Sequence, residues 1–224
     1  MPLNSPSIRA ILLRAPVIPV LTVTEFAQSV PLARALVAGG LPVLEVTLRS
    51  PVALAAIEVM RAEVPDAIVG AGTVLDEAQL ASAVRAGSQF IVSPGFSAPL
   101  CAAAAGHGVA MLPGVATASE LMAALAAGID TLKFFPAAQA GGVAMLKAFA
   151  APFPGVRFCP TGGIDLDQAP AYLRLRNVLC VGMSSVAPAA LLAARDYAAI
   201  TALARQAAAL RDVVAARAGA PRKS

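Results

Sequence analysis

The chain has 224 residues, of which 58% are hydrophobic and 13% are charged, and its formal net charge at pH 7 is +4. This apolar content excludes an intrinsically disordered protein and favours a globular protein that forms an oligomer. Basic residues form no long run with aromatic residues between them, so we expect no nucleic-acid partner.

Short apolar or β-branched runs alternate with longer alanine- and leucine-rich stretches along the whole chain. The alternation begins with an expected helix at Ser7–Arg14 and ends with a long helix at Tyr197–Arg217. Between them lie eight strand-like runs: Val17–Val23, Val43–Thr47, Ile68–Gly72, Phe90–Ser93, Val109–Leu112, Thr131–Phe135, Val156–Pro160 and Val178–Gly182. Helix start signals follow six of these runs, at Thr24, Ser50, Asp76, Ser97, Thr117 and Asp165.

Eight βα units within 224 residues predict an α/β protein, a single (β/α)8 TIM barrel with an extra N-terminal helix. We expect one domain over residues 1–224, with a disordered tail at about 218–224. The alternative is a Rossmann fold, because Gly70 and Gly72 begin like a dinucleotide fingerprint. Leu75 stands in the place of the third glycine, however, and no acidic residue ends a following strand, so the barrel is favoured.

The longest stretches without Asp, Glu, Lys or Arg are residues 86–119 and 177–194. Glycine, proline and serine divide both of them, whereas a membrane-spanning helix needs about 20 predominantly apolar residues. We predict no membrane span, no signal peptide and a cytoplasmic location. The three cysteines, Cys101, Cys159 and Cys180, show no metal-ligand spacing and are expected to be buried thiols.

Polar residues recur where the predicted strands end. In a parallel barrel, only the carboxyl ends of the strands converge on one open mouth, so reactive groups belong there. The residues at this level include Glu45, Arg49, Thr73, Lys133, Thr161 and Ser184, together with the non-polar turn residues Pro94, Gly162 and Gly163. His107, the single histidine, lies in a helix-to-strand connection at the opposite side, and we expect it on the surface.

Lys133 is one of only three lysines, and it stands within a strand-like run. Lysine is almost never fully buried without a partner or a task, and a neutral lysine amine can attack a ketone to form a Schiff base. Glu45 can relay protons to such a lysine, and the planar fork of Arg49 can hold a carboxylate. A purely structural ion pair of Glu45 with Lys133 or Arg49 remains the alternative at this stage.

Gly162 and Gly163 form a glycine pair between a strand and a helix. Backbone N–H groups exposed in such a loop can bind phosphate, and Ser184 adds a hydroxyl from the neighbouring strand. An ordinary tight turn is the alternative, since glycine pairs are common in turns. No histidine pair or carboxylate cluster offers metal-ligand spacing, so neither a metal nor another cofactor is expected.

The motifs LEVTLRS, IVGAGTVL, FIVSPG, LPGVAT, LKFFPA and RFCPTGGI occur in this order over nearly the whole chain. In this respect the sequence resembles the 2-keto-3-deoxy-6-phosphogluconate (KDPG) aldolases, a family that includes 4-hydroxy-2-oxoglutarate (KHG) aldolases. The resemblance implies a homotrimeric, metal-independent class I aldolase of the Entner–Doudoroff route. It would cleave KDPG, a keto-acid sugar phosphate, to pyruvate and glyceraldehyde 3-phosphate.

The resemblance also implies a role for each strand-end residue. It assigns the Schiff base to Lys133 and proton transfer to Glu45. The remaining assignments are carboxylate binding at Arg49 and Thr73, a pocket shaped by Pro94 and Phe135, contact near the reacting carbons at Thr161, and phosphate binding at Gly162, Gly163 and Ser184.

Strand eight departs from the family pattern. The family continues this strand as Gly-Gly-Ser or Gly-Gly-Thr followed by tryptophan, whereas this chain has Gly182, Met183, Ser184 and Ser185 and no tryptophan at all. This leaves open a preference for KHG or for 2-keto-3-deoxy-6-phosphogalactonate. A phosphate-binding barrel isomerase and a non-catalytic sugar-phosphate-binding barrel are the more distant alternatives.

Overall fold

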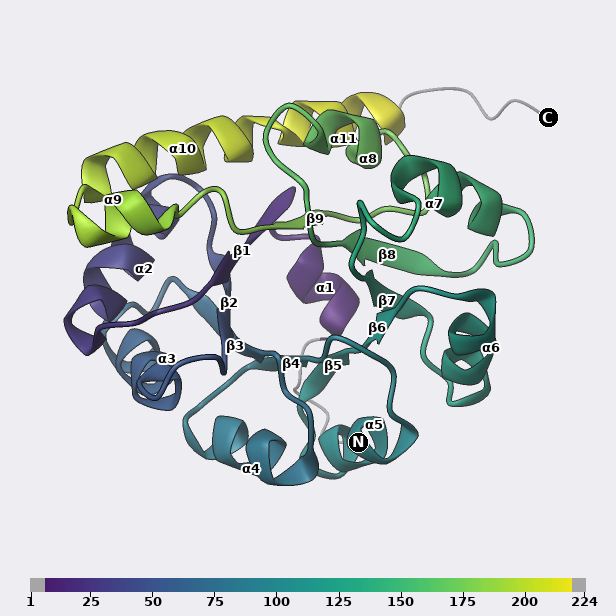
Figure 1. Ribbon diagram of the computed structural model, residues 1–224, viewed down its shortest axis with the longest axis horizontal. Helices are drawn as coiled ribbons and strands as arrows, with labels where there is room; N and C mark the ends of the chain where they lie inside the picture. The colour runs from purple at the N-terminus through teal and green to yellow at the C-terminus, as the bar shows by residue number, and fades with distance from the viewer. Residues whose placement is uncertain (1–6, 219–224) are drawn as a thin grey trace.

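The structure, a computed structural model, describes residues 7–218 and has an α/β fold built on parallel strands. Six strands form a curled sheet in the order β5-β4-β3-β2-β1-β9, and three form a second sheet in the order β6-β7-β8. Figure 1 shows the strands arranged around helix α1, with the other helices outside them. The strands are β1 (Val17–Leu21), β2 (Val43–Thr47), β3 (Ile68–Gly72), β4 (Phe90–Val92), β5 (Ala110–Leu112), β6 (Gly114–Val115), β7 (Thr131–Phe134), β8 (Arg157–Pro160) and β9 (Val181–Met183).

The two sheets adjoin each other at both ends. Pro113 alone separates β5 from β6, and its carbonyl accepts a hydrogen bond from the Lys133 backbone N–H at 2.9 Å. At the other end, isolated bridges join Phe158 to Val178 and Thr161 to Gly182. The predicted run Val109–Leu112 therefore continues past the proline as the separate short strand β6.

Helices follow the strands, as the alternation predicts. They are α1 (Ile8–Leu12), a 3-10 helix (Phe26–Gln28), α2 (Ser29–Ala38), α3 (Ala53–Glu63), α4 (Glu77–Arg85), α5 (Ala98–Gly106), α6 (Ala118–Ala126), α7 (Gly142–Ala150), α8 (Ala169–Leu173), α9 (Ala189–Ala193), α10 (Tyr197–Ala209) and α11 (Arg211–Ala218). The helix predicted at Tyr197–Arg217 is divided at Leu210 into α10 and α11. Residues 219–224, most of the predicted tail, lie outside the described residues.

The predicted helix starts divide into two groups. The side chains of Asp76, Ser97 and Thr117 cap α4, α5 and α6, and this part of the prediction is confirmed. The predictions at Thr24 and Ser50 were wrong, because α2 and α3 begin at Ser29 and Ala53. Asp165 accepts a hydrogen bond from the Gln168 N–H at 2.9 Å, which is the contact of a helix cap, although α8 begins only at Ala169. The Ser50 hydroxyl donates to the carbonyl of Val23 and so fixes the loop after β1 rather than a helix end.

The core is continuous and largely aliphatic, with an aromatic cluster under the second sheet. All five residues of β2 are buried, as expected for a strand covered on both faces. Phe134, Phe149 and Phe158 pack together with ring centroids 6.2 to 6.3 Å apart. The three cysteines are free and buried, and His107 is exposed at the end of α5, as predicted.

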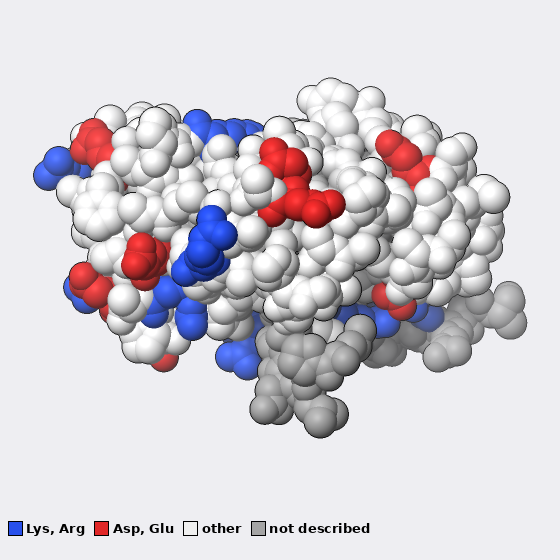
Figure 2. Space-filling model, turned by 90° about the horizontal axis from the view of Figure 1, so that it is seen from below, with Lys and Arg blue, Asp and Glu red and all other residues white. Residues whose placement is uncertain are grey.

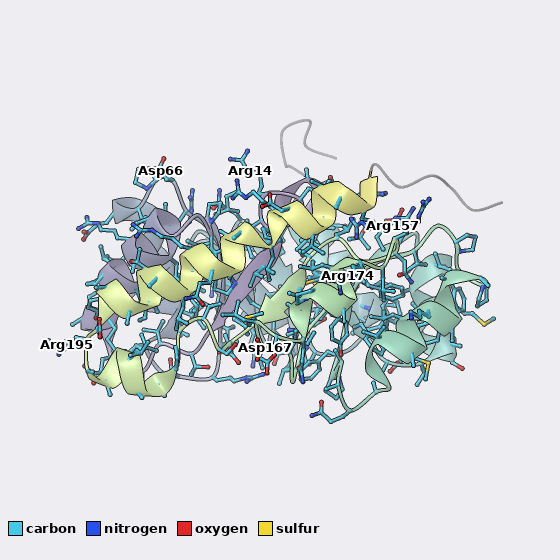
Figure 3. The ribbon with its side chains drawn as sticks, turned by 90° about the horizontal axis from the view of Figure 1, so that it is seen from above. Arg14, Asp66, Arg157, Asp167, Arg174 and Arg195 are labelled. Carbon is cyan, nitrogen blue, oxygen red and sulfur yellow. The ribbon has the colours of Figure 1, made fainter. Side chains whose placement is uncertain are left out.

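The amino ends and the carboxyl ends of the strands lie on opposite sides of the molecule. Figure 3 places Asp66, which precedes β3, at the edge opposite Asp167, which follows β8. Since the strands are parallel, their carboxyl ends share the side marked by Asp167.

Figure 2 shows a molecular face on which charged side chains are scattered over a mostly uncharged surface. Within residues 7–218, no helix has the length and apolar character that a bilayer crossing requires.

Candidate active site

A buried ion pair lies at the carboxyl ends of the strands. The Nζ of Lys133 on β7 donates to Oε1 of Glu45 on β2 at 3.1 Å, and the two side chains are 6% and 4% exposed. Lys133 Nζ also lies 5.2 Å from the centre of the Phe135 ring. An amine held this close to a carboxylate, and shielded from water, can pass its proton to that carboxylate before it attacks a carbonyl carbon.

Gly72 makes room for the Glu45 carboxylate. Gly72 pairs with Thr47 of β2, so the end of β3 lies beside the end of β2. A Cβ added at Gly72 would lie 2.3 Å from Oε1 of Glu45, far closer than any real contact. The glycine at this position is therefore part of what holds the carboxylate next to Lys133.

Arg49 and Thr73 form the second part of the site. The Arg49 Nε donates to the Thr73 hydroxyl at 3.1 Å. Thr73 has φ +58°, a left-handed conformation that β-branched residues rarely adopt. A non-glycine residue in this region costs about 1–3 kcal/mol and persists where the surroundings require it. The pair places a guanidinium and a hydroxyl side by side, which suits the binding of a carboxylate.

A cavity of about 140 Å³ connects Lys133 with the loops after β8 and β9. Its lining includes Arg49, Lys133, Phe135, Thr161, Gly162, Gly163 and Ser184. Both glycines have left-handed backbones, with φ +103° at Gly162 and +70° at Gly163. The predicted phosphate residues and the predicted Schiff-base lysine thus face one cavity.

Pro94 lies at the edge of the site rather than in the cavity lining. Its carbonyl oxygen approaches β6 so closely that a Cβ added at Gly114 would lie 2.1 Å away from it. Gly114 in turn pairs with Lys133. Pro94 therefore touches the strand neighbour of the lysine.

The candidate site does not coincide with the largest hollow described for the chain. A larger hollow of about 530 Å³ lies beside α11 and is lined by Arg174, Arg176 and Arg217 together with Asp212. Its lining contains neither a nucleophile nor a base comparable to Lys133 and Glu45. Within the described ranges, no three His, Cys, Asp or Glu side chains gather as a metal-binding group.

The comparison with known protein families decides the family. A sequence model of the family described as KDPG and KHG aldolase matches residues 8–203. The chain belongs to this aldolase family. The protein is therefore a lyase by family, and its strand-end ion pair lies in an aldolase scaffold.

Individual relatives agree over almost their full length. The 2-dehydro-3-deoxy-phosphogluconate aldolase of Dickeya dadantii is 51% identical over 90% of this chain and 94% of its own. The KHG/KDPG aldolase of Escherichia coli K12 gives the same identity and coverage. A crystal structure of the Zymomonas mobilis KDPG aldolase superposes with a TM-score of 0.87, at 51% identity, over 91% of this chain and 97% of that one.

A further solved structure bears on the chemistry of the family. The KDPG aldolase of Legionella pneumophila, with pyruvate captured as a covalent carbinolamine intermediate, has a TM-score of 0.87 and 45% identity. The superposition covers 89% of this chain and 97% of that one.

The departure from the family pattern in the eighth predicted run lies in β9 of this aldolase, and the structure shows where its methionine points. Met183 is 1% exposed, joins the hydrophobic core and pairs with Pro19 of β1. It is absent from the lining of the cavity, whereas Gly182 and Ser184 on either side belong to it. The side chain of Met183 therefore lies on the face of β9 turned away from the cavity. Ser185 is exposed beside Ser184 and lines an adjoining cavity.

Sequence reasoning missed several residues of this candidate site. Val20 and Thr22 line the cavity, and Gly72 and Gly182 leave space for Glu45 and Thr161. Thr22 was included in the predicted run Val17–Val23, although β1 ends at Leu21. A polar residue inside an otherwise apolar run was the available signal.

Proposed function

We propose that the protein is a class I aldolase that cleaves KDPG to pyruvate and glyceraldehyde 3-phosphate through a Schiff base on Lys133. The observation that carries the proposal is the buried pair of Lys133 and Glu45, with 3.1 Å between Nζ and Oε1. Support comes from relatives at 51% identity that are named for this activity. The covalent pyruvate carbinolamine in the Legionella relative fits an amine nucleophile.

The proposed reaction begins with a proton transfer from Lys133 to Glu45, which leaves a neutral amine. The amine attacks the C2 ketone of the substrate. Glu45 returns its proton to the carbinolamine hydroxyl, which leaves as water and gives a protonated imine. The C4 hydroxyl then gives its proton to Glu45, the C3–C4 bond breaks, and its electrons move to the imine nitrogen. Glyceraldehyde 3-phosphate leaves, the enamine takes a proton at C3, and water releases pyruvate from Lys133.

The cavity offers a place for each end of the substrate. In this proposal Arg49 and Thr73 hold the substrate carboxylate, which aligns the imine with the bond that breaks. Phe135, with Pro94 behind the neighbouring strand, shapes the pyruvate pocket. Thr161 lies beside the reacting carbons, and the phosphate binds to the N–H groups of the loop 162–163 and to Ser184.

Reductive trapping tests the proposal. Incubation with pyruvate and borohydride should add one reduced pyruvyl group to Lys133, identified by peptide mass spectrometry. Lys147 is exposed on α7 and provides the matched control. The Lys147→Arg variant should label like the wild type, and Lys133→Arg should not label. An adduct elsewhere, or none, would overturn the assignment.

The proposal extends to architecture, assembly and location. The two adjoining sheets are proposed to act as one closed (β/α)8 barrel with α1 at its floor, in a single domain. A homotrimer is proposed because Met122 and Leu125 on α6 are 64% and 39% exposed and the surface carries little charge. The Entner–Doudoroff route and the cytoplasm remain the predicted setting, without a metal, a nucleic acid or a membrane as partner.

A further inference from the structure

Thr22 is a cavity residue that the proposed reaction does not use. It directly follows β1, which pairs with β2 on one side and with β9 on the other. Thr22 lines the catalytic cavity and also a second cavity of about 270 Å³, whose lining includes Ser184 and Ser185. It therefore lies between the proposed carboxylate end at Arg49 and the proposed phosphate end at Ser184.

The hydrogen bonds around Thr22 fix the direction of its hydroxyl. Thr47, which is fully buried, donates its only hydroxyl proton to the carbonyl of Leu21 at 2.9 Å. The hydroxyl oxygens of Thr22 and Thr47 lie 3.0 Å apart. Because the Thr47 proton is already used, both bonds hold together only when Thr22 donates to Thr47. Thr22 then has no proton left and presents only lone pairs to the cavity.

We infer that Thr22 is a specificity-determining residue that accepts a hydrogen bond from the C5 hydroxyl of the substrate. The inference rests on the proposed function. During cleavage the C4 hydroxyl gives up its proton, so the C5 hydroxyl is the one in this half of KDPG that keeps a proton to donate. KHG carries a carboxylate at C5, which has only lone pairs at neutral pH.

The locked Thr22 hydroxyl therefore discriminates between the two substrates. It completes a chain of donors from the C5 hydroxyl through Thr22 and Thr47 to the Leu21 carbonyl, and such chains strengthen each bond in them. When KHG is bound, the lone pairs of the Thr22 hydroxyl oxygen face those of the C5 carboxylate, and the two groups repel each other. The arrangement favours KDPG over KHG, and it does not involve the side chain of Met183, which lies in the core.

Two variants of Thr22 test the inference through the ratio of kcat/KM for KDPG to kcat/KM for KHG. Thr22→Val keeps the shape and removes the hydroxyl, while Thr22→Ser keeps the hydroxyl. Thr22 is exposed, so both variants should fold. Loss of one neutral hydrogen bond should lower the ratio about threefold to tenfold in Thr22→Val, through a lower value for KDPG. Thr22→Ser should keep the wild-type ratio.

A third variant, Thr47→Val, removes the acceptor that fixes the direction of the Thr22 hydroxyl proton. Without the Thr47 oxygen as its acceptor, Thr22 regains a proton that it can donate to a C5 carboxylate. The ratio should fall again, this time because kcat/KM for KHG rises while the value for KDPG changes little. A thermal melt of each variant and pyruvate trapping at Lys133 establish that the fold and the Schiff-base step are intact.

The outcomes separate this inference from the proposed function. A wild-type protein that cleaves neither substrate would overturn the proposed function and the Thr22 inference together. An active wild type with equal losses on both substrates in Thr22→Val, or with no loss at all, would overturn the role of Thr22 alone. A reduced ratio in Thr22→Ser, equal to that of Thr22→Val, would also overturn it, because the hydroxyl would not be the cause.

Discussion

Replacing Gly72 with alanine should separate the catalytic geometry from the stability of the fold. The new Cβ would lie 2.3 Å from Oε1 of Glu45, 2.6 Å from its Cγ and 2.8 Å from its Cδ, whereas ordinary contacts begin at 3.4 Å. The carboxylate must therefore move by about 1 Å, and a displacement of this size can cost about 100-fold in rate. The atoms displaced belong to a side chain and not to the backbone, so β3 should keep its place.

The assay is steady-state cleavage of KDPG, with released pyruvate followed by a coupled dehydrogenase. We expect kcat to fall about 100-fold, which corresponds to about 2.7 kcal/mol, while thermal unfolding stays cooperative. Gly106→Ala is the control, because a Cβ added there meets nothing within 4 Å and should leave kcat unchanged. Turnover of Gly72→Ala within threefold of the wild type would refute the claim that Gly72 holds Glu45 in place.

Three further changes test neighbouring parts of the structure. Glu45→Gln keeps the volume but removes the proton acceptor, so kcat for KDPG cleavage should fall by about 10²–10⁴, measured in the same assay. Gly182→Ala would place a Cβ 2.2 Å from Oγ1 of Thr161, and we expect kcat/KM to fall about tenfold or more while the melting temperature changes little. Burial raises the pKa of the Cys180 thiol well above its usual value, so this group stays neutral in the folded protein. The unfolded thiol ionises first, and the stability present below about pH 8.5 should decline as the pH rises. Urea unfolding at about pH 8 and about pH 10 should show this decline, and Cys180→Ala should reduce it.

Each of these expectations has a result that contradicts it. Glu45→Gln with wild-type kcat would show that another group carries the proton. A Gly182→Ala protein with unchanged kcat/KM would show that Thr161 can move without loss. An equal decline in stability with pH in the wild type and in Cys180→Ala would assign the decline to other groups.

The rule that reactive groups lie at the carboxyl ends of parallel strands predicted that Lys133 and Glu45 come together, because their meeting depends only on the direction in which the strands run. Lys133 and Glu45 are 88 residues apart in sequence, yet each stands near the carboxyl end of a parallel strand, so the fold brings them to one side. Gly72 could be assigned to a strand but not to a function. Its role depends on the 2.3 Å approach of one carboxylate oxygen, which only coordinates reveal.

Strand boundaries were less predictable than strand order. The run Val178–Gly182 is uniformly apolar, but β9 begins at Val181. The N–H of Val178 turns back to Leu175, and the N–H of Leu179 bonds to Phe158, so the first part of the run makes a bend and a bridge. An apolar segment is predicted to be buried, but its sequence does not predict which carbonyl each backbone N–H bonds to. The sequence likewise does not predict which face of β9 carries the Met183 side chain, because that depends on how β9 pairs with β1.

The left-handed backbone of Thr73 lowers the stability of the fold at a position that places a hydroxyl beside Arg49. Glycine would adopt φ +58° without strain, so a laboratory selection for heat resistance alone should favour Thr73→Gly. That change would also remove the hydroxyl that Arg49 contacts. Threonine at this position therefore carries backbone strain, and in the proposed function the hydroxyl that accompanies the strain supports carboxylate binding.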